Sequence, residues 1–257
     1  MTRLWLMPEA AILERPTNRD EAWRYADADY LAEAELALLT GWQELHIPAG
    51  EAREETRIVE AGVERLRVNV GQGARYALFA INAAGPYARL EVEVTLEEGA
   101  HFEFGGVTLG GGNKVQEFVT RTIHAQPNAT SNQIVRAVQW GRSTGNFLGR
   151  IEVVKHAQKT DAAQNFRAML LEKGASANTK PELEIFADDV QCAHGAAIGQ
   201  LDEAARYYMA ARGIAPDVAR KLLVQAFIGD AFVEMSDQSQ AESMLERALA
   251  QLDEAAL

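Results

Sequence analysis

The chain has 257 residues, of which 37 are acidic and 25 are basic, so its formal net charge is −12, and 47% of its residues are hydrophobic. This is the composition of an ordinary soluble protein, long enough for one large domain or for one core with smaller appendages. The composition argues against a nucleic-acid-binding protein, because phosphate binding needs clustered basic side chains and the longest basic run is Arg220-Lys221.

A single cysteine, Cys192, excludes an internal disulfide framework and any all-thiolate zinc or iron–sulfur site built within one chain. It fits a reducing compartment. The first residues, MTRLWLMPE, are interrupted too soon for a signal peptide, and no stretch approaches the ~18 apolar residues of a membrane span. We therefore expect a cytoplasmic protein without a membrane role.

Residues 1–44 are predicted to form a short N-terminal helical segment. Asn18 and Glu21 have the spacing of a capping box, in which the Asn18 oxygen accepts a hydrogen bond from the third helical N–H and Glu21 reaches back. Helix-forming residues follow as far as Leu38, and Gly41 is a C-terminal stop. The pattern predicts one helix over about residues 18–40.

Residues 45–200 are predicted to form a β-rich core. Apolar side chains alternate with polar ones at Leu66, Val68 and Val70, which is the period of a strand. Glycine, asparagine and proline turns separate such segments, with no convincing amphipathic helix between them. The same alternation recurs at Leu90, Val92, Val94, Leu96, Phe102, Phe104, Phe147, Ile151 and Val153.

The strand pattern leaves three architectures open. The lack of helices argues against an alternating βαβ layout and leaves a sandwich, a barrel or a parallel β-helix. Crisp Asn-Gly or Asp-Gly hairpin turns are missing, which favours the β-helix over the sandwich, although no fixed repeat length is visible.

Residues 201–257 return to a helical period. Asp202 is predicted to cap a short helix that stops at Gly213, and Pro216 suits the first turn of the next helix. Ser239 and Glu242 have capping-box spacing and would open a last helix. The middle helix is expected to place on one face the apolar residues Val218, Leu222, Leu223, Ala226 and Phe227.

Two short motifs carry little chemistry. Residues 141–145, GRSTG, match the nucleophile elbow as a string, but a strand rather than a helix is predicted to follow, so Ser143 is expected in a simple turn. No phosphate-binding loop is present, so we do not expect this chain to hydrolyse ATP by itself.

Residues 188–195, DDVQCAHG, are richer in metal-ligand types than any other stretch. In a strand, Cys192 and His194 would point to the same face, where a thiolate and an imidazole suit zinc, copper or the edge of an iron–sulfur cluster. Two ligands cannot close a four-coordinate site, so a second chain or exogenous ligands would have to complete it. A buried cysteine beside a hydrogen-bonded histidine is the structural alternative.

The same neighbourhood resembles the core signature of the SufB/SufD proteins of the SUF iron–sulfur cluster assembly system, through residues 179–195, TKPELEIFADDVQCAHG. Residues 207–214, YYMAARGI, are similar to a second family segment, and DEAWRY at 20–25 resembles the N-terminal box. Met209 stands where SufB-like chains carry a cysteine, which makes the chain similar to the SufD branch. The chain is shorter than is usual for the family.

The resemblance implies a right-handed parallel β-helix between helical ends. It also implies a SufB-like partner, a homodimer when the chain is alone, and a SufC-like ATPase bound by the C-terminal helices. No cofactor is expected to be tightly bound to the isolated chain, although a transient iron–sulfur cluster is expected in the complex. His194, with Cys192 second, is the expected ligand or proton-handling residue near the partner. The ATPase-binding residues that the resemblance implies are Tyr207, Tyr208, Arg212, Gly213 and Phe227.

The leading interpretation is thus a non-catalytic, SufD-like scaffold subunit. A carbohydrate-active β-helix enzyme is an alternative, but it needs paired carboxylates that converge on a groove, and adjacent Asp188 and Asp189 would face opposite ways in a strand. A purely structural homodimer is a third possibility. The helical end is the expected docking region for the ATPase. Removal of residues 200–235 is therefore predicted to abolish ATPase binding and to leave the β-core folded.

Overall fold

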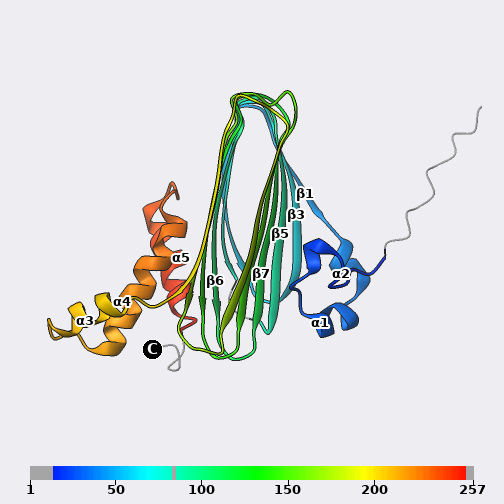
Figure 1. Ribbon diagram of the computed structural model, residues 1–257. Helices are drawn as coiled ribbons and strands as arrows, with labels where there is room; N and C mark the ends of the chain where they lie inside the picture. Colours follow the sequence, from blue (N-terminus) through cyan, green and yellow to red (C-terminus); the bar gives the residue numbers. More distant parts are fainter. Residues whose placement is uncertain (1–13, 83–84, 253–257) are drawn as a thin grey trace, which may run out of the picture.

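The centre of the molecule is a parallel β-solenoid of two facing sheets (Figure 1). A computed structural model describes residues 14–82 and 85–252. Sheet A has the strand order β1-β3-β5-β7-β9-β11, and sheet B has the order β12-β10-β8-β6-β4-β2. Every pairing is parallel. The predicted parallel β-helix is therefore confirmed, because a hairpin-built sandwich or barrel would pair neighbouring strands antiparallel.

Successive strands of the chain alternate between the two sheets. Their bounds are β1 (Gln43–Ile47), β2 (Ala52–Val59), β3 (Gly62–Val70), β4 (Arg75–Asn82), β5 (Tyr87–Leu96), β6 (His101–Gly110), β7 (Val115–His124), β8 (Thr130–Gln139), β9 (Thr144–Val153), β10 (Asp161–Leu170), β11 (Ser176–Ile185) and β12 (Gln191–Gln200).

The main hydrophobic core fills the space between the sheets. Leu66, Val68 and Val70 of β3 are buried, and so are the other apolar residues of the predicted alternation. Each such side chain contributes about 1.5–3 kcal/mol by leaving water. The aromatic rings are in contact, since the ring centroids of Phe104 and Phe118 are 5.4 Å apart. Alternation thus predicted the inward-facing side chains correctly.

The coils of the solenoid differ in length, which explains why no repeat length is visible in the sequence. The offset between register partners is 23 residues from Gln43 to Leu66 and grows to 32 residues from Gly145 to Ala177. The turns at one end of the strands stay aligned all the same. In each, a residue with positive φ donates its N–H to a carbonyl of the next coil, and these residues are Gly50, Gly73, Gly99, Asn128 and Lys159.

His124, at the end of β7, provides a pH-dependent contribution to stability. It is fully buried, and its Nε2 lies 2.9 Å from Ser131 Oγ. Burial lowers the pKa of His124 from 6.5 to about 4, because the charged imidazolium is poorly solvated there. The unfolded chain therefore gains a proton near pH 6.5 that the folded chain gains only near pH 4.

We expect the free energy of unfolding to decrease as the pH falls through this window, by about 3 kcal/mol at most from His124. Urea unfolding at a series of pH values measures the effect. His124→Gln should flatten the slope, whereas His156→Gln, at an exposed histidine, should leave it unchanged. An equally steep slope in His124→Gln would contradict this assignment.

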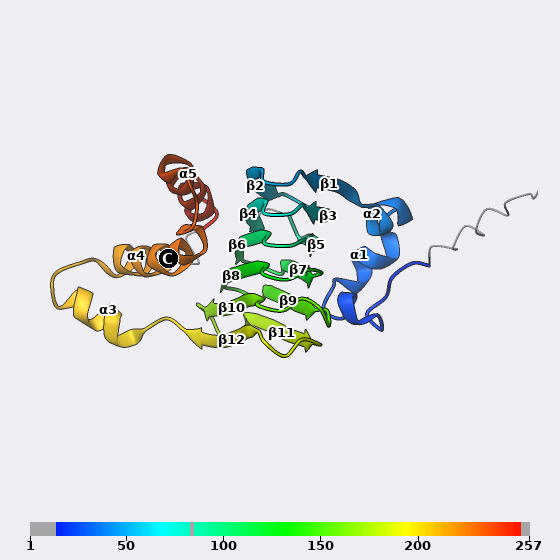
Figure 2. The same ribbon diagram turned by 90° about the horizontal axis from the view of Figure 1, so that it is seen from above.

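Four helical elements follow β12: α3 (Glu203–Ala210), α4 (Pro216–Gly229), η2 (Asp230–Phe232) and α5 (Gln238–Leu249). Of these, α4, η2 and α5 pack on the outer face of sheet B (Figure 2). The Asp202 carboxylate accepts hydrogen bonds from the N–H groups of Ala204 and Ala205, and Pro216 lies in the first turn of α4. These two features were predicted correctly. None of the described helices is long and apolar enough to span a membrane.

Two details of these helices correct the predictions. Val218 and Leu222 of α4 are exposed, because sheet B contacts a different row of the helix, which includes Val224 and Ile228. The cap of α5 is the Asp237 side chain rather than Ser239, because the carboxylate is the stronger acceptor for the first free N–H groups.

The contact between these helices and sheet B is a second hydrophobic core. Phe79 and Val107 of the sheet and Val224, Ile228 and Phe232 of the helices are all buried in it. Removal of the C-terminal helices would return this sheet surface to water. We therefore expect such a truncation to destabilise the solenoid, contrary to the prediction from sequence.

The N-terminal segment lies along the outer face of sheet A (Figure 2) as three short helices, η1 (Glu21–Trp23), α1 (Ala28–Glu33) and α2 (Leu36–Thr40). The predicted single helix and its capping box are wrong. The Asn18 amide donates to the carbonyls of Trp23 and Ala26, at 3.1 and 2.8 Å, instead of capping a helix. Asp27 starts a separate helix by accepting from the N–H of Tyr30.

Candidate functional site

The last coil of the solenoid, formed by β11 and β12, is open on one side. These strands stand at the same end of the two sheets and pair on their other side with β9 and β10. Apolar side chains are exposed here, with 63% of Phe186 and 47% of Ile198 accessible to solvent. Edge strands with exposed apolar side chains are templates for another chain.

Cys192 and His194 lie on β12, two residues apart, as predicted. Their register partners on β10 are Ala162 and Gln164, and Gln164 is 2% exposed. The Gln164 amide donates to the Glu182 carbonyl of the opposite sheet, at 3.2 Å, so this face of β12 looks into the space between the sheets. His194 is nevertheless exposed, because no further coil covers this one.

The two side chains differ in environment. Cys192 is partly buried against Ile151, Val153 and Ala162. Burial, with a smaller effect of the Asp161 carboxylate, raises the pKa of the Cys192 thiol. A protonated thiol is a poor nucleophile and a poor metal ligand, so His194 is the better-placed donor.

The acidic residues of the same stretch do not join a metal site. Asp188 and Asp189 lie in the turn between β11 and β12, not in a strand, and Asp189 forms an ion pair with Lys159. Within residues 14–82 and 85–252, no three His, Cys, Asp or Glu side chains are grouped as metal ligands.

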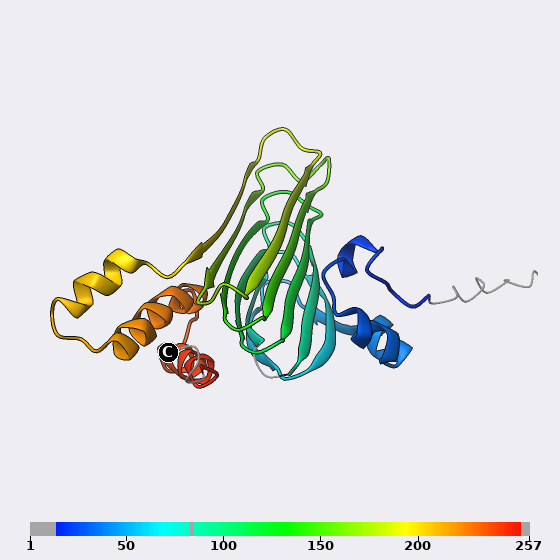
Figure 3. The same ribbon diagram turned by 60° about the horizontal axis from the view of Figure 1, so that its bottom comes forward.

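A second exposed surface lies on α3 and α4, and Figure 3 shows the two helices projecting from the solenoid. Tyr207 is 79% exposed and Tyr208 60% exposed. The Arg212 guanidinium lies 4.3 Å from the centre of the Tyr208 ring and orients it. Gly213, with φ of 79°, turns the chain from α3 towards α4. The structure thus brings four of the predicted ATPase-binding residues together.

The fifth predicted residue, Phe227, lies elsewhere. It is half-buried on the sheet-facing side of α4, with its ring centre 5.9 Å from the Arg136 guanidinium. The large apolar residues that α4 exposes are instead Val218 and Leu222. A helical-face pattern alone could not distinguish them from the buried row, because α4 is apolar on more than one side.

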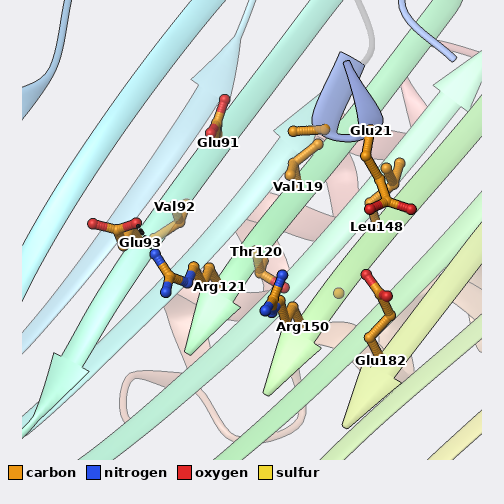
Figure 4. A pocket seen from close by; sticks show the side chains of 12 residues that line it. Glu21, Glu91, Val92, Glu93, Val119, Thr120, Arg121, Leu148, Arg150 and Glu182 are labelled. Atoms are coloured by element: carbon orange, nitrogen blue, oxygen red, sulfur yellow. Dashed lines mark hydrogen bonds and ion pairs between the residues drawn. The ribbon is translucent and has the colours of Figure 1, made fainter. Parts of the chain in front are cut away.

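A groove of about 220 Å³ on the outer face of sheet A lies under η1 (Figure 4). Its floor is Val119 and Leu148, and carboxylates and guanidinium groups surround it. Two of these carboxylates, Glu91 and Glu93, are bound by arginines, and the charges of Arg89 and Arg65 hold the pKa of Glu91 below its usual value despite burial. A glycosidase acid needs the opposite shift.

The Ser143 hydroxyl is also unsuited to catalysis. Ser143 is fully buried in the turn between β8 and β9, and its Oγ donates to the carbonyl of Gly110 at 2.7 Å. The interpretation of residues 141–145 as a simple turn is correct.

Comparison with known proteins identifies the family. Residues 55–227 match the family model described as SUF system FeS cluster assembly, SufBD core domain. The chain is 34% identical over 161 residues to an iron–sulfur cluster assembly SufBD family protein of Synechocystis, and 33% identical over 135 residues to the iron–sulfur cluster assembly protein SufD of Escherichia coli. These matches cover 62% and 52% of this chain but only 36% and 32% of the relatives.

A chloroplastic Arabidopsis thaliana protein, ABCI7, is 40% identical over 110 residues, which are 42% of this chain and 23% of that protein. The chain therefore spans about a third or less of the length of these three relatives. The shared part is the solenoid with the start of the C-terminal helices. On the match to more than half of its length, the chain belongs to the SufBD core family of the SUF iron–sulfur cluster assembly system.

Proposed function

We propose that the chain is a SufD-like scaffold subunit that forms one wall of an iron–sulfur cluster assembly site. The observation that carries the proposal is the open coil of β11 and β12, which combines edge strands, exposed apolar side chains and the exposed His194. The similarity to SufD of Escherichia coli supports the assignment to the SufD-like branch of the family. The subunit is non-catalytic and cytoplasmic in this proposal.

The open coil would bind a SufB-like chain edge to edge. Each of its strands is ten residues long, so pairing would satisfy a long row of backbone groups and bury Ile185, Phe186 and Ile198. In the absence of SufB, a second copy of this chain would occupy the same surface and form a homodimer.

The cluster is cargo of the complex, held transiently between the chains. With a single cysteine, this chain cannot supply the thiolates, so the partner provides most ligands and this chain contributes His194. A SufC-like ATPase would bind the surface of Tyr207, Tyr208 and Arg212, and its nucleotide cycle would move the helices relative to the coil.

The pairing is tested by introducing charge into the open coil. Ile185→Lys with Ile198→Lys should abolish co-purification with a co-expressed SufB-like chain and keep the isolated chain monomeric in sedimentation velocity. The control is Leu38→Lys with Val233→Lys, which adds the same charge at two exposed apolar residues of other surfaces and should pair normally. Undiminished pairing of the Ile185/Ile198 variant would refute the proposed interface.

The role of His194 is tested separately. His194→Ala should leave the melting temperature and complex formation nearly unchanged but lower cluster assembly in a reconstituted system, followed by the visible absorbance of the cluster. Cys192→Ser should lower assembly less, because the thiol is protonated and partly buried. If His194→Ala instead breaks the complex without a separate assembly defect, the residue is structural and the homodimer interpretation gains support.

A further inference from the structure

The two ends of the solenoid carry different chemistry on their inward faces. At the N-terminal end, the outermost strands are β1, of five residues, and β2, of eight residues. At the other end, β11 and β12 have ten residues each. Either end leaves a row of backbone groups for another chain, so side chains must decide which end is used.

Charged side chains of β2 point inward across the N-terminal end of the solenoid, which we call the N-terminal mouth. Glu55 accepts a hydrogen bond from the hydroxyl of Tyr76, a fully buried core residue, at 3.1 Å. Arg57 lies on the same face of β2, two residues on, and reaches the opposite sheet: its Nη1 is 3.2 Å from Gln43 Oε1 on β1 and 3.2 Å from Glu64 Oε2 on β3.

Ion pairs join these residues into one network. Arg57 is 3.8 Å from Glu55, and Arg53 also forms an ion pair with Glu55. The Glu55 and Arg57 side chains keep only 18% and 22% of their surface exposed. We call Arg53, Glu55, Arg57 and Glu64 the mouth network. It spans the gap between the two sheets.

The C-terminal end has no counterpart of the mouth network. The inward-facing positions of β11 and β12, identified by their register with the core residues of β9 and β10, include no Asp, Glu, Lys or Arg. They are Ala177, Thr179, Pro181, Leu183, Ile185, Cys192, His194, Ala196, Ile198 and Gln200.

This difference controls which end can accept strands. A coil added over the N-terminal mouth would remove water from four charges without supplying new partners, whereas a coil added at the C-terminal end would cover apolar and small polar groups. Inward-pointing charges are one of the ways in which natural sheets prevent edge-to-edge association.

We propose that the mouth network blocks addition of a second solenoid at the N-terminal end, so that association of this chain stops at a pair. Where both ends of a subunit can bind, head-to-tail contacts generate open-ended filaments instead of closed pairs. The statement that association stops at a pair rests on the proposed pairing through β11 and β12. The block at the N-terminal mouth does not depend on that pairing.

The experiment therefore uses the full chain with its C-terminal coil already blocked by Ile185→Lys and Ile198→Lys. In that background, Arg53→Met, Glu55→Gln, Arg57→Met and Glu64→Gln remove the charges of the mouth network while keeping similar side-chain size and an acceptor for Tyr76. Sedimentation velocity over a range of concentrations should show self-association increased by about tenfold or more in the association constant.

The matched control removes four charges of the same kinds from the outer face of sheet A, by Glu44→Gln, Arg67→Met, Glu93→Gln and Arg121→Met, and should stay monomeric. A milder variant, Arg57→Met with Glu64→Gln, should associate more than the background even where the fourfold variant unfolds. The charge swap Arg57→Glu with Glu64→Arg keeps the mouth charged and should not associate.

The proposal would be overturned if the fourfold variant and the Arg57→Met, Glu64→Gln variant were both folded and monomeric. It would also be overturned if the matched control associated as strongly as the fourfold variant. Because the C-terminal coil is blocked in every sample, these outcomes are independent of whether β11 and β12 bind a SufB-like chain. With the coil unblocked, the same removals should convert a pair into a concentration-dependent series of larger species.

Discussion

Replacing Tyr207 and Tyr208 with alanine is expected to lower the affinity for a SufC-like ATPase by about 30-fold or more for each residue, because exposed aromatic side chains that anchor an interface typically contribute about 2 kcal/mol or more. Both rings are exposed in the isolated chain, and Arg212 holds one of them in place. Titration calorimetry with the purified ATPase measures the loss.

Leu38→Ala, at an exposed apolar residue of the N-terminal segment, is the control and should bind normally. The tyrosine variant should keep its melting temperature, because α3 has no buried residue. This variant is a better test than a chain ending near Leu201, which would lose the second hydrophobic core together with the docking surface. Undiminished binding would place the ATPase elsewhere.

Arg89→Leu is expected to lower the free energy of unfolding by about 3–5 kcal/mol, because removal of one partner leaves buried charge uncompensated. The Arg89 side chain is fully buried, and its guanidinium donates to Glu117 at 3.2 Å and to Glu91 at 3.0 Å. Its central carbon lies 3.8 Å from the centre of the Trp23 ring, so the N-terminal segment covers the pair.

Urea unfolding measures this loss, with Arg121→Leu as the control. Arg121 also binds two carboxylates on sheet A, but its side chain is 44% exposed, so its removal should cost about 1 kcal/mol or less. Adding Glu117→Gln to Arg89→Leu should restore part of the stability. If Arg89→Leu is as stable as the parent chain, Arg89 is not needed to compensate the buried charges of Glu91 and Glu117.

The elements of the fold were largely predictable because they depend on local rules. A strand with one face in the core must alternate, as Leu66, Val68 and Val70 do, whatever lies opposite. Asp202 caps α3 because a carboxylate there reaches the first free N–H groups of its own helix. The stretch with Cys192 and His194 could be read in the same way, since two residues in a strand always share a face.

Local rules failed where two local signals competed. Asn18 and Glu21 have capping-box spacing, yet Trp23 packs against Arg89 of sheet A and the chain turns before a long helix can form. Likewise Val218 and Phe227 both look like core residues of α4, and only contact with sheet B exposes the first and half-buries the second. The solenoid repeat could not be recognised in the sequence either, because the length of the coils changes along the chain.

The amino-acid sequence by itself therefore determined the strands, the helical end, the lack of a phosphate loop and the ligand-bearing stretch at β12. Only the tertiary structure decided that His194 is exposed while Cys192 is partly buried, and that Glu55 and Arg57 close one mouth of the solenoid while the other stays open. The physical reason is that exposure at an end depends on whether another coil stacks there, and stacking is a property of residues far apart in the chain.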